Sequence, residues 1–318
     1  MTTVDSQPSS PASWATEPEQ RYARRQSALA DRYDVAVESR TVETDAAGQI
    51  HYLVAGDPDG QPVVLLHGVS TTAATWLPMV PALTDDYRVY IPDRPGRGLS
   101  AAPSYRGRNL RWFMVGYLVE LFDELGLDQA HVVGNSLGGQ QAFLLALDTD
   151  CVDRLCLVGA PGGLSREFAL AFRLLTVRGL NRLLFWLNGL GDPFETAQQQ
   201  TEQTLVADNS AVSTEFYELL AASSEMPDRQ RSLRSLQSAQ GSFGRMHELF
   251  DLREEVVDID RPTGFVWGSE DSFWEPAVGR PVAEQMGAEF HELTDHGHMP
   301  WLEPGEQTET AVRSFLDG

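Results

Sequence analysis

A serine between small residues is the most informative chemical feature of this 318-residue sequence. Ser136 lies in the stretch GNSLGG at 134–139, which matches the pattern G-x-S-x-G. It falls between a predicted strand that ends at Val133 and a predicted helix that begins near Leu137. A serine at so sharp a turn projects its hydroxyl above the sheet, at a helix N-terminus that favours developing negative charge. The alternative is an ordinary polar turn, but the strand–turn–helix context favours a nucleophile.

A serine hydroxyl is a poor nucleophile unless a base takes its proton, and two later segments offer the partners. Asp271 follows a predicted buried strand in the stretch WGSED, with Glu270 as the alternative carboxylate. His298 follows the last predicted strand in the stretch HGHMP, with His296 as the alternative base. We therefore interpret Ser136 as the nucleophile, His298 as the general base and Asp271 as the acid that orients the histidine.

The third requirement is a site for the oxyanion that forms when a serine attacks a carbonyl. The predicted strand at 63–66 runs into the stretch HGVS. When a nucleophilic serine follows a later strand of the same sheet, a backbone N–H group of this early loop can donate to the oxyanion. We expect the backbone N–H groups of Val69 and Leu137 to form the oxyanion hole. His67 is interpreted as a structural hydrogen-bonding residue rather than a catalytic one.

Substrate contacts are harder to predict from the sequence. Trp76, Phe273 and Met299 are candidate lining residues, and each of them could equally belong to the core. A strongly apolar stretch at 168–190 favours a hydrophobic or aromatic substrate. That stretch could also form a membrane-surface helix, but arginines interrupt it and the overall negative charge would repel anionic lipid, so packing over the site is preferred.

Short apolar runs alternate with helical segments along most of the chain. This alternation predicts an α/β fold with a doubly wound, mostly parallel sheet. From about 162 to 252 the pattern changes to helices with no convincing strand, which indicates a helical cap inserted after the sixth strand. Strands are expected at 35–44, 50–55, 63–66, 87–91, up to 133, 155–158, 263–267 and 289–293, and helices at 110–125, 137–147 and 306–316.

These patterns divide the chain into three parts. Residues 1–34 are expected to form a disordered tail, to about residue 17, and an N-terminal helix. Residues 35–161 and 253–318 are expected to form the α/β core, and residues 162–252 the cap.

Composition excludes several classes of function. Acidic residues number 46 against 24 basic ones, all of them arginines, so the formal charge is −22 and no basic footprint for nucleic acid exists. No run approaches the ~20 apolar residues of a membrane span. Cys151 and Cys156 are interpreted as small apolar residues rather than as metal ligands. We expect a cytoplasmic protein with a small-molecule substrate, no cofactor, no metal, no nucleic-acid or membrane partner, and an oligomeric state that the sequence leaves open.

Five stretches in order are similar to those of the α/β-hydrolase superfamily. They are LLHG at 65–68, DRPGRGLS at 93–100, GNSLGG at 134–139, WGSED at 267–271 and GHMPWLEP at 297–304. The resemblance covers about residues 35–318, favours His298 over His296, and implies that the helical stretch caps the substrate pocket. GNSLGG and LVGAPGG at 157–163 resemble hydrolases that cleave carbon–carbon bonds in ring-fission products.

We therefore predict a carboxylic-ester hydrolase that acts through an acyl-enzyme. The alternatives are a C–C bond hydrolase of ring-fission products, a cofactor-free haloperoxidase or perhydrolase, an acyltransferase, and a non-catalytic ligand-binding protein with the same fold. An aspartate at the nucleophile position would indicate an epoxide hydrolase or haloalkane dehalogenase, but that position holds Ser136.

The acidic, lysine-free composition resembles that of proteins from salt-accumulating halophiles and predicts a salt requirement. In molar salt the Debye length falls to ~3 Å, which screens the repulsion among surface carboxylates. We expect the free energy of unfolding, measured by thermal or chemical denaturation, to be higher in molar KCl than in low KCl. Greater stability in low salt would contradict this prediction.

Overall fold

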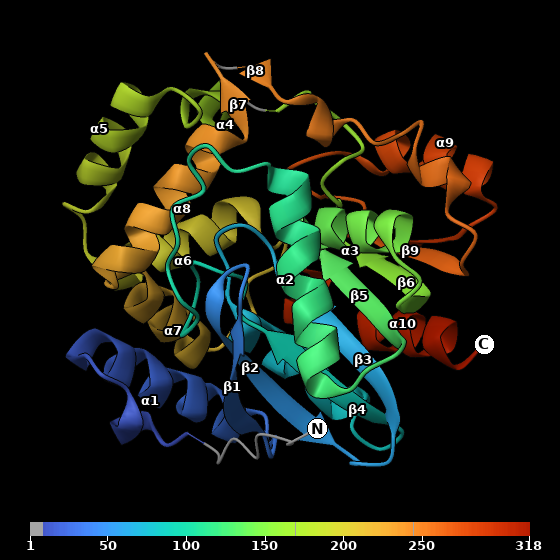
Figure 1. Ribbon diagram of the computed structural model, residues 1–318, viewed down its shortest axis with the longest axis horizontal. Coiled ribbons are helices and arrows are strands. Elements are labelled where there is room, and N and C mark those ends of the chain that lie inside the picture. The colour runs from blue at the N-terminus through green and yellow to red at the C-terminus, as the bar shows by residue number, and fades with distance from the viewer. Residues whose placement is uncertain (1–8, 169, 244) are drawn as a thin grey trace.

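The computed structural model describes residues 9–168, 170–243 and 245–318, and its centre is an eight-stranded sheet (Figure 1). β1 and β2 pair antiparallel, β2 pairs antiparallel with β4, and all the other neighbours are parallel. The prediction of a doubly wound, mostly parallel sheet is confirmed. In spatial order the strands are β1 (Glu38–Thr44), β2 (Gly48–Gly56), β4 (Tyr87–Pro92), β3 (Gln61–Leu66), β5 (Ala130–Asn135), β6 (Val152–Val158), β9 (Thr263–Gly268) and β10 (Glu289–Leu293).

Helices cover both faces of the sheet, which explains why the central strands are continuous apolar runs. Successive side chains of a strand point to opposite faces. In β3, Val63 and Leu65 accordingly belong to one hydrophobic cluster, whereas Val64 and Leu66 belong to the other. The first cluster includes residues of α1 (Glu17–Arg32), the 3₁₀ helix η2 (Ala73–Ala82) and α10 (Gln307–Asp317), and the second includes residues of α2 (Leu110–Leu125), α3 (Leu137–Asp148) and α9 (Pro276–Met286).

Residues 162–252, here called the cap segment, connect β6 to β9. Figure 1 shows the helices of this segment on one side of the sheet, with α7 beside α1. Its helices are α4 (Leu170–Leu174), α5 (Arg178–Asn188), α6 (Pro193–Thr204), α7 (Thr214–Ser224) and α8 (Pro227–Ala239).

The cap segment differs from the sequence prediction in one respect, because it also contains two short strands. β7 (Gly241–Ser242) pairs antiparallel with β8 (Arg245–Met246). Two-residue strands are too short for hydrophobic periodicity to reveal. Short 3₁₀ helices follow at Glu248–Phe250 and Val256–Asp258, before β9 begins.

The N-terminal segment contacts the core of the fold before its first long helix begins. The expectation of a disordered tail up to about residue 17 stays a prediction, and its first eight positions lie outside the described residues. Pro11–Ser13 forms a 3₁₀ helix, and the ring of Trp14 packs edge-on against that of His51 at 5.6 Å. The helix that follows buries Tyr22 and Leu29 in the core, so it is an integral part of the fold. No helix among the described residues is long and apolar enough to cross a membrane.

Candidate active site

The backbone between β5 and α3 holds Ser136 in a conformation that few non-glycine residues adopt. Its φ is 57° and its ψ is −119°, which marks a tight and strained turn. Gly138 makes this turn possible, because a Cβ there would lie 2.0 Å from the carbonyl oxygen of Leu66. Ser136 therefore ends the strand and begins the helix, at the carboxyl edge of the sheet where ligands bind in doubly wound folds.

Asp271 and His298 meet at the same edge of the sheet, although 27 positions separate them in the sequence. The carboxylate oxygen Oδ2 of Asp271 accepts a hydrogen bond from Nδ1 of His298 at 2.8 Å, and both side chains are buried. The same oxygen accepts the N–H of Ala160 at 2.8 Å, while Oδ1 accepts that of Phe273 at 2.9 Å. Because both backbone donors fix the carboxylate, its orientation toward the histidine is set by the fold.

Two side chains hold His298 in place from other directions. The amide Nδ2 of Asn135 donates to the carbonyl of His298 at 3.0 Å and to that of Val158 at 2.8 Å. The ring of Phe273 packs against the imidazole with 4.2 Å between centroids. Asn135 lies in the stretch GNSLGG, but no local pattern indicates that it reaches the histidine loop, because its partner His298 is 163 positions away.

His67 determines which way the peptide before Val69 faces. Its Nδ1 lies 2.8 Å from the carbonyl oxygen of Gly68, and its Nε2 accepts the N–H of Arg94 at 2.9 Å. Burial and the nearby charge of Arg94 lower the pKa of His67 to about 3, so the ring is neutral and its Nδ1–H donates to Gly68. In a trans peptide the N–H points opposite to the carbonyl, so the N–H of Val69 points away from His67.

The N–H groups of Val69 and Leu137 have no hydrogen-bond acceptor among the residues described by the structure. Leu137 is the first residue of α3, where the N–H groups have no partner within the helix. Val69 lies beside Ser136 on the wall of the same cavity. Two free donors next to a serine at a helix N-terminus are what an oxyanion requires.

Two buried arginines, which no local sequence pattern marks as site residues, hold the loop that carries Val69. Nη2 of Arg94 donates to the carbonyl of Val69 at 2.7 Å. Arg97 donates through Nε to the carbonyl of Thr71 at 3.1 Å and through Nη2 to that of Ser70. Both belong to the stretch DRPGRGLS, which was noted as a family motif without a role for its arginines. Because their guanidinium groups donate hydrogen bonds to three carbonyl oxygens of the loop, they fix its backbone.

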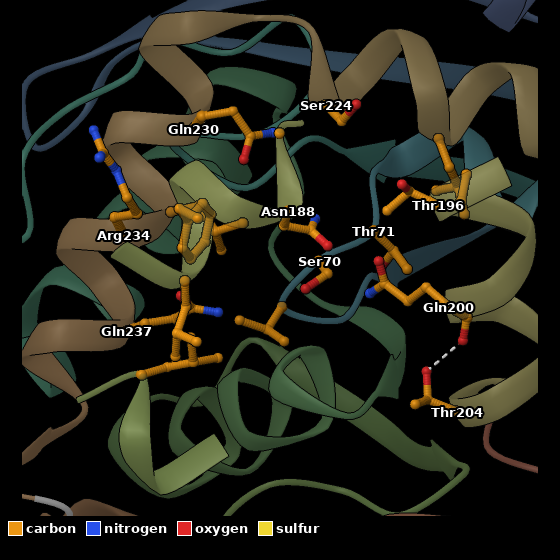
Figure 2. A pocket seen from close by; sticks show the side chains of 18 of the residues that line it. Ser70, Thr71, Asn188, Thr196, Gln200, Thr204, Ser224, Gln230, Arg234 and Gln237 are labelled. Carbon is orange, nitrogen blue, oxygen red and sulfur yellow. Dashed lines mark hydrogen bonds between the residues drawn. The ribbon is translucent and has the colours of Figure 1, made fainter. Parts of the chain in front are cut away.

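A cavity of about 1300 Å³ lies between the α/β core and the cap segment and contains Ser136 and His298 on its wall. Phe273 and Met299 line it as expected, but Trp76 does not. Trp76 is fully buried in the core, where it stacks on Trp301 with 4.1 Å between ring centroids. Figure 2 shows polar side chains facing each other across this cavity: Gln230, Arg234 and Gln237 of α8 on one side and Thr196, Gln200 and Thr204 of α6 on the other, with Ser70 and Thr71 between them.

The alternative acid and base lie outside this arrangement. Nδ1 of His296 lies 2.7 Å from the carbonyl oxygen of Thr294, and neither His296 nor Glu270 lines the cavity. Of the candidate acids and bases, the structure pairs Asp271 with His298, and His298 lines the same cavity as Ser136.

A second serine, histidine and aspartate lie in a chain of hydrogen bonds elsewhere in the fold. Oγ of Ser39 lies 2.9 Å from Nε2 of His51, whose Nδ1 lies 2.7 Å from Oδ2 of Asp93. His51 and Asp93 are completely buried and Ser39 does not line the cavity. The trio therefore resembles a catalytic triad in side-chain connectivity but lies away from the cavity that contains Ser136, which makes Ser39 a useful control for Ser136.

Comparison with known proteins gives the same assignment of fold. A model of the alpha/beta hydrolase family matches residues 63–311. The crystal structure of carboxylesterase CesB (YbfK) from Bacillus subtilis superposes with a TM-score of 0.75 at 21% identity, covering 95% of this chain and 99% of that one. At this level of identity the superposition is evidence for the fold alone.

Among characterised relatives the chain resembles enzymes of more than one activity. It is 24% identical over 299 residues to carboxylesterase YbfK of Bacillus subtilis, a match that covers 90% of this chain and 92% of the esterase. It is 28% identical over 287 residues to 2-hydroxy-6-oxo-6-phenylhexa-2,4-dienoate hydrolase of Comamonas testosteroni, covering 84% and 91%. A match of 27% to the dihydrolipoyllysine-residue acetyltransferase component of the acetoin cleaving system of Cupriavidus necator covers 80% of this chain but only 63% of that protein.

The lowered pKa of His67 predicts that the fold is sensitive to acid. Between the ordinary pKa of 6.5 and the folded pKa of about 3, the unfolded chain binds a proton that the folded chain does not. Stability therefore falls as the pH falls through this window, by up to ~1.4 kcal/mol per pH unit. Urea denaturation from pH 7 to pH 4 should show this loss.

Other buried groups also change the free energy of unfolding with pH. The variant His67→Gln separates the contribution of His67 from theirs. Glutamine can still accept the N–H of Arg94 but does not titrate. We expect the variant to be less stable at pH 7 and to lose less stability than the wild type on acidification. Equal losses in the two proteins would contradict a neutral, buried His67.

Proposed function

The chain belongs to the alpha/beta hydrolase family, and on that premise we propose that it is a serine hydrolase that cleaves a carboxylic ester through an acyl-enzyme on Ser136. The observation that carries the proposal is the buried 2.8 Å hydrogen bond from His298 to Asp271, together with the cavity that both His298 and Ser136 line. The carboxylesterase relative, matched over nearly its whole length, supports the same reaction class.

The first half of the reaction follows from the tautomer of His298. Because Nδ1 donates to Asp271, Nε2 of the neutral ring carries the lone pair and can accept a proton. Ser136 attacks the carbonyl carbon of the ester while Nε2 takes the hydroxyl proton. Asp271 stays ionised and stabilises the imidazolium that results.

The oxyanion and the leaving group complete the cycle. The N–H groups of Val69 and Leu137 bind the negatively charged oxygen of the tetrahedral intermediate. His298 then returns its proton to the leaving alcohol, and the carbonyl of the acyl-enzyme re-forms. Water, deprotonated by His298, attacks this acyl group, and His298 then returns the proton to Oγ of Ser136 as the carboxylic acid leaves.

The lining of the cavity supports a substrate with an apolar group next to the ester. Val69, Leu205, Phe273 and Met299 belong to the wall that also contains Ser136 and His298. Polar side chains of α6 and α8 line other parts of the wall (Figure 2). We therefore propose a small hydrophobic ester whose remaining part can accept hydrogen bonds from these helices.

Cleavage of a carbon–carbon bond is the second candidate, favoured by the likeness to the Comamonas testosteroni hydrolase. The same three side chains would serve either reaction, so the site alone does not separate them. Parallel assays with aryl esters and with a vinylogous diketone substrate would decide which bond is cleaved.

Replacing Ser136 with Ala should abolish ester hydrolysis and covalent labelling by a fluorophosphonate probe while leaving the fold intact. Removal of the nucleophile should lower kcat by ~10⁴- to 10⁶-fold. The assay is in-gel fluorescence with a fluorophosphonate in molar KCl, together with a circular dichroism spectrum of each variant.

Ser39→Ala is the matched control, because Ser39 has a histidine and an aspartate behind it but does not line the cavity that contains Ser136. It should label and turn over like the wild type. Labelling that persists in Ser136→Ala, or disappears in a folded Ser39→Ala, would refute the assignment of the nucleophile.

A further inference from the structure

One short piece of the cap segment contacts both loops that carry the proposed acid and base. We call residues 204–208, which begin at the last residue of α6, the strap. Oγ of Ser272, next to Asp271, donates to the carbonyl of Thr204 at 2.7 Å. The N–H of Met299, next to His298, donates to the carbonyl of Leu205 at 2.7 Å.

Glu303 joins the strap to the other side of His298. Its carboxylate is only 5% exposed and accepts the N–H of Gly297 with both oxygens, at 3.0 and 3.1 Å. Oε1 also accepts the N–H groups of Ala207 and Asp208, the latter at 3.1 Å. Gly297 and Met299 are the two neighbours of His298. Met299 bonds directly to the strap, and Gly297 is linked to it through Glu303, so the backbone is fixed on both sides of the histidine.

The packing between the strap and the histidine loop is as close as the hydrogen bonds imply. A Cβ on Gly297 would lie 2.8 Å from the backbone of Val206 and Ala207, so only glycine lets the two segments approach this closely. A shift of the strap would therefore move the loop that carries His298, and a shift of the loop would move the strap.

A carboxylate suits this position better than any neutral side chain. Three backbone N–H groups converge on it, and it has only acceptor sites. A glutamine that keeps its oxygen at the position of Oε1 would place its NH₂ group where Oε2 now accepts the N–H of Gly297, so two donors would face each other beside His298. Burial raises the pKa of Glu303, and hydrogen bonds from the N–H groups of Ala207, Asp208 and Gly297 oppose this effect.

We propose that Glu303 is a positioning residue for the hydrolysis, which locks the backbone at His298 to the strap and thereby holds the acid loop, the base loop and the cap segment in one arrangement. This inference rests on the proposed Ser136–His298–Asp271 mechanism. Because Gln200, Thr204 and Leu205 line the cavity at the end of α6, the same link connects the substrate-binding wall of the cap to the catalytic histidine.

The test is Glu303→Gln, measured as the rate per active site. A fluorophosphonate titration counts the reactive serines, and ester turnover is divided by that count. Misplacement of His298 by a fraction of an ångström should lower kcat per titrated site by about 10- to 100-fold with little change in KM. A residue that only stabilises the fold would lower the number of reactive sites and leave the rate at each site unchanged.

Glu309→Gln is the matched control, since it removes another partly buried carboxylate from the same end of the chain. Oε2 of Glu309 has no hydrogen-bond partner among the described residues, and no hydrogen bond links Glu309 to the strap there. This variant should keep the wild-type rate per site. Wild-type kcat per site in Glu303→Gln would overturn the inference, as would an equal loss in Glu309→Gln.

A second variant keeps the inference testable if Glu303→Gln does not fold. Ser272 is exposed, so Ser272→Ala removes the bond between the strap and the acid loop with little risk to the core. It should lower kcat per site at unchanged KM, and an unchanged kcat would count against the strap. A wild-type protein that the probe does not label would instead contradict the proposed function itself.

Discussion

The buried hydrogen bond between Asp271 and His298 is the interaction on which the rest of the site depends. Both side chains are almost completely buried, so a misplaced partner would leave a buried charge without compensation. Backbone N–H groups of Ala160 and Phe273 fix the carboxylate, and the amide of Asn135 fixes the backbone of the histidine. The pair is therefore oriented before any substrate binds, which is the condition for efficient proton transfer.

Parallel strands bring these residues together. The carboxyl ends of β3, β5, β6 and β9 lie at one edge of the sheet, and each is followed by a loop that contributes to the site. The loop after β3 needs further support, because its N–H groups must remain free. His67, Arg94 and Arg97 provide that support by bonding its carbonyls, which leaves the N–H of Val69 facing away from His67.

Local sequence predicted the sheet and the candidate triad because each depends on a short pattern. An apolar run, a glycine-flanked serine, and a carboxylate or histidine after a strand are visible within a few residues. The core position of Trp76 against Trp301, the bond of Asn135 to His298 and the bonds of Glu303 to the strap depend on partners at least 95 positions away. The contact between Trp14 and His51 is likewise not visible in the composition of the N-terminal segment.

The most direct measurement is mass spectrometry of the enzyme quenched within milliseconds of mixing with an activated aryl ester, followed by peptide mapping. An acyl group on the peptide that contains Ser136, formed and lost at rates that account for turnover, is the predicted result. Turnover without an acylated peptide, or acylation confined to another residue such as Ser39, would contradict an acyl-enzyme mechanism at Ser136.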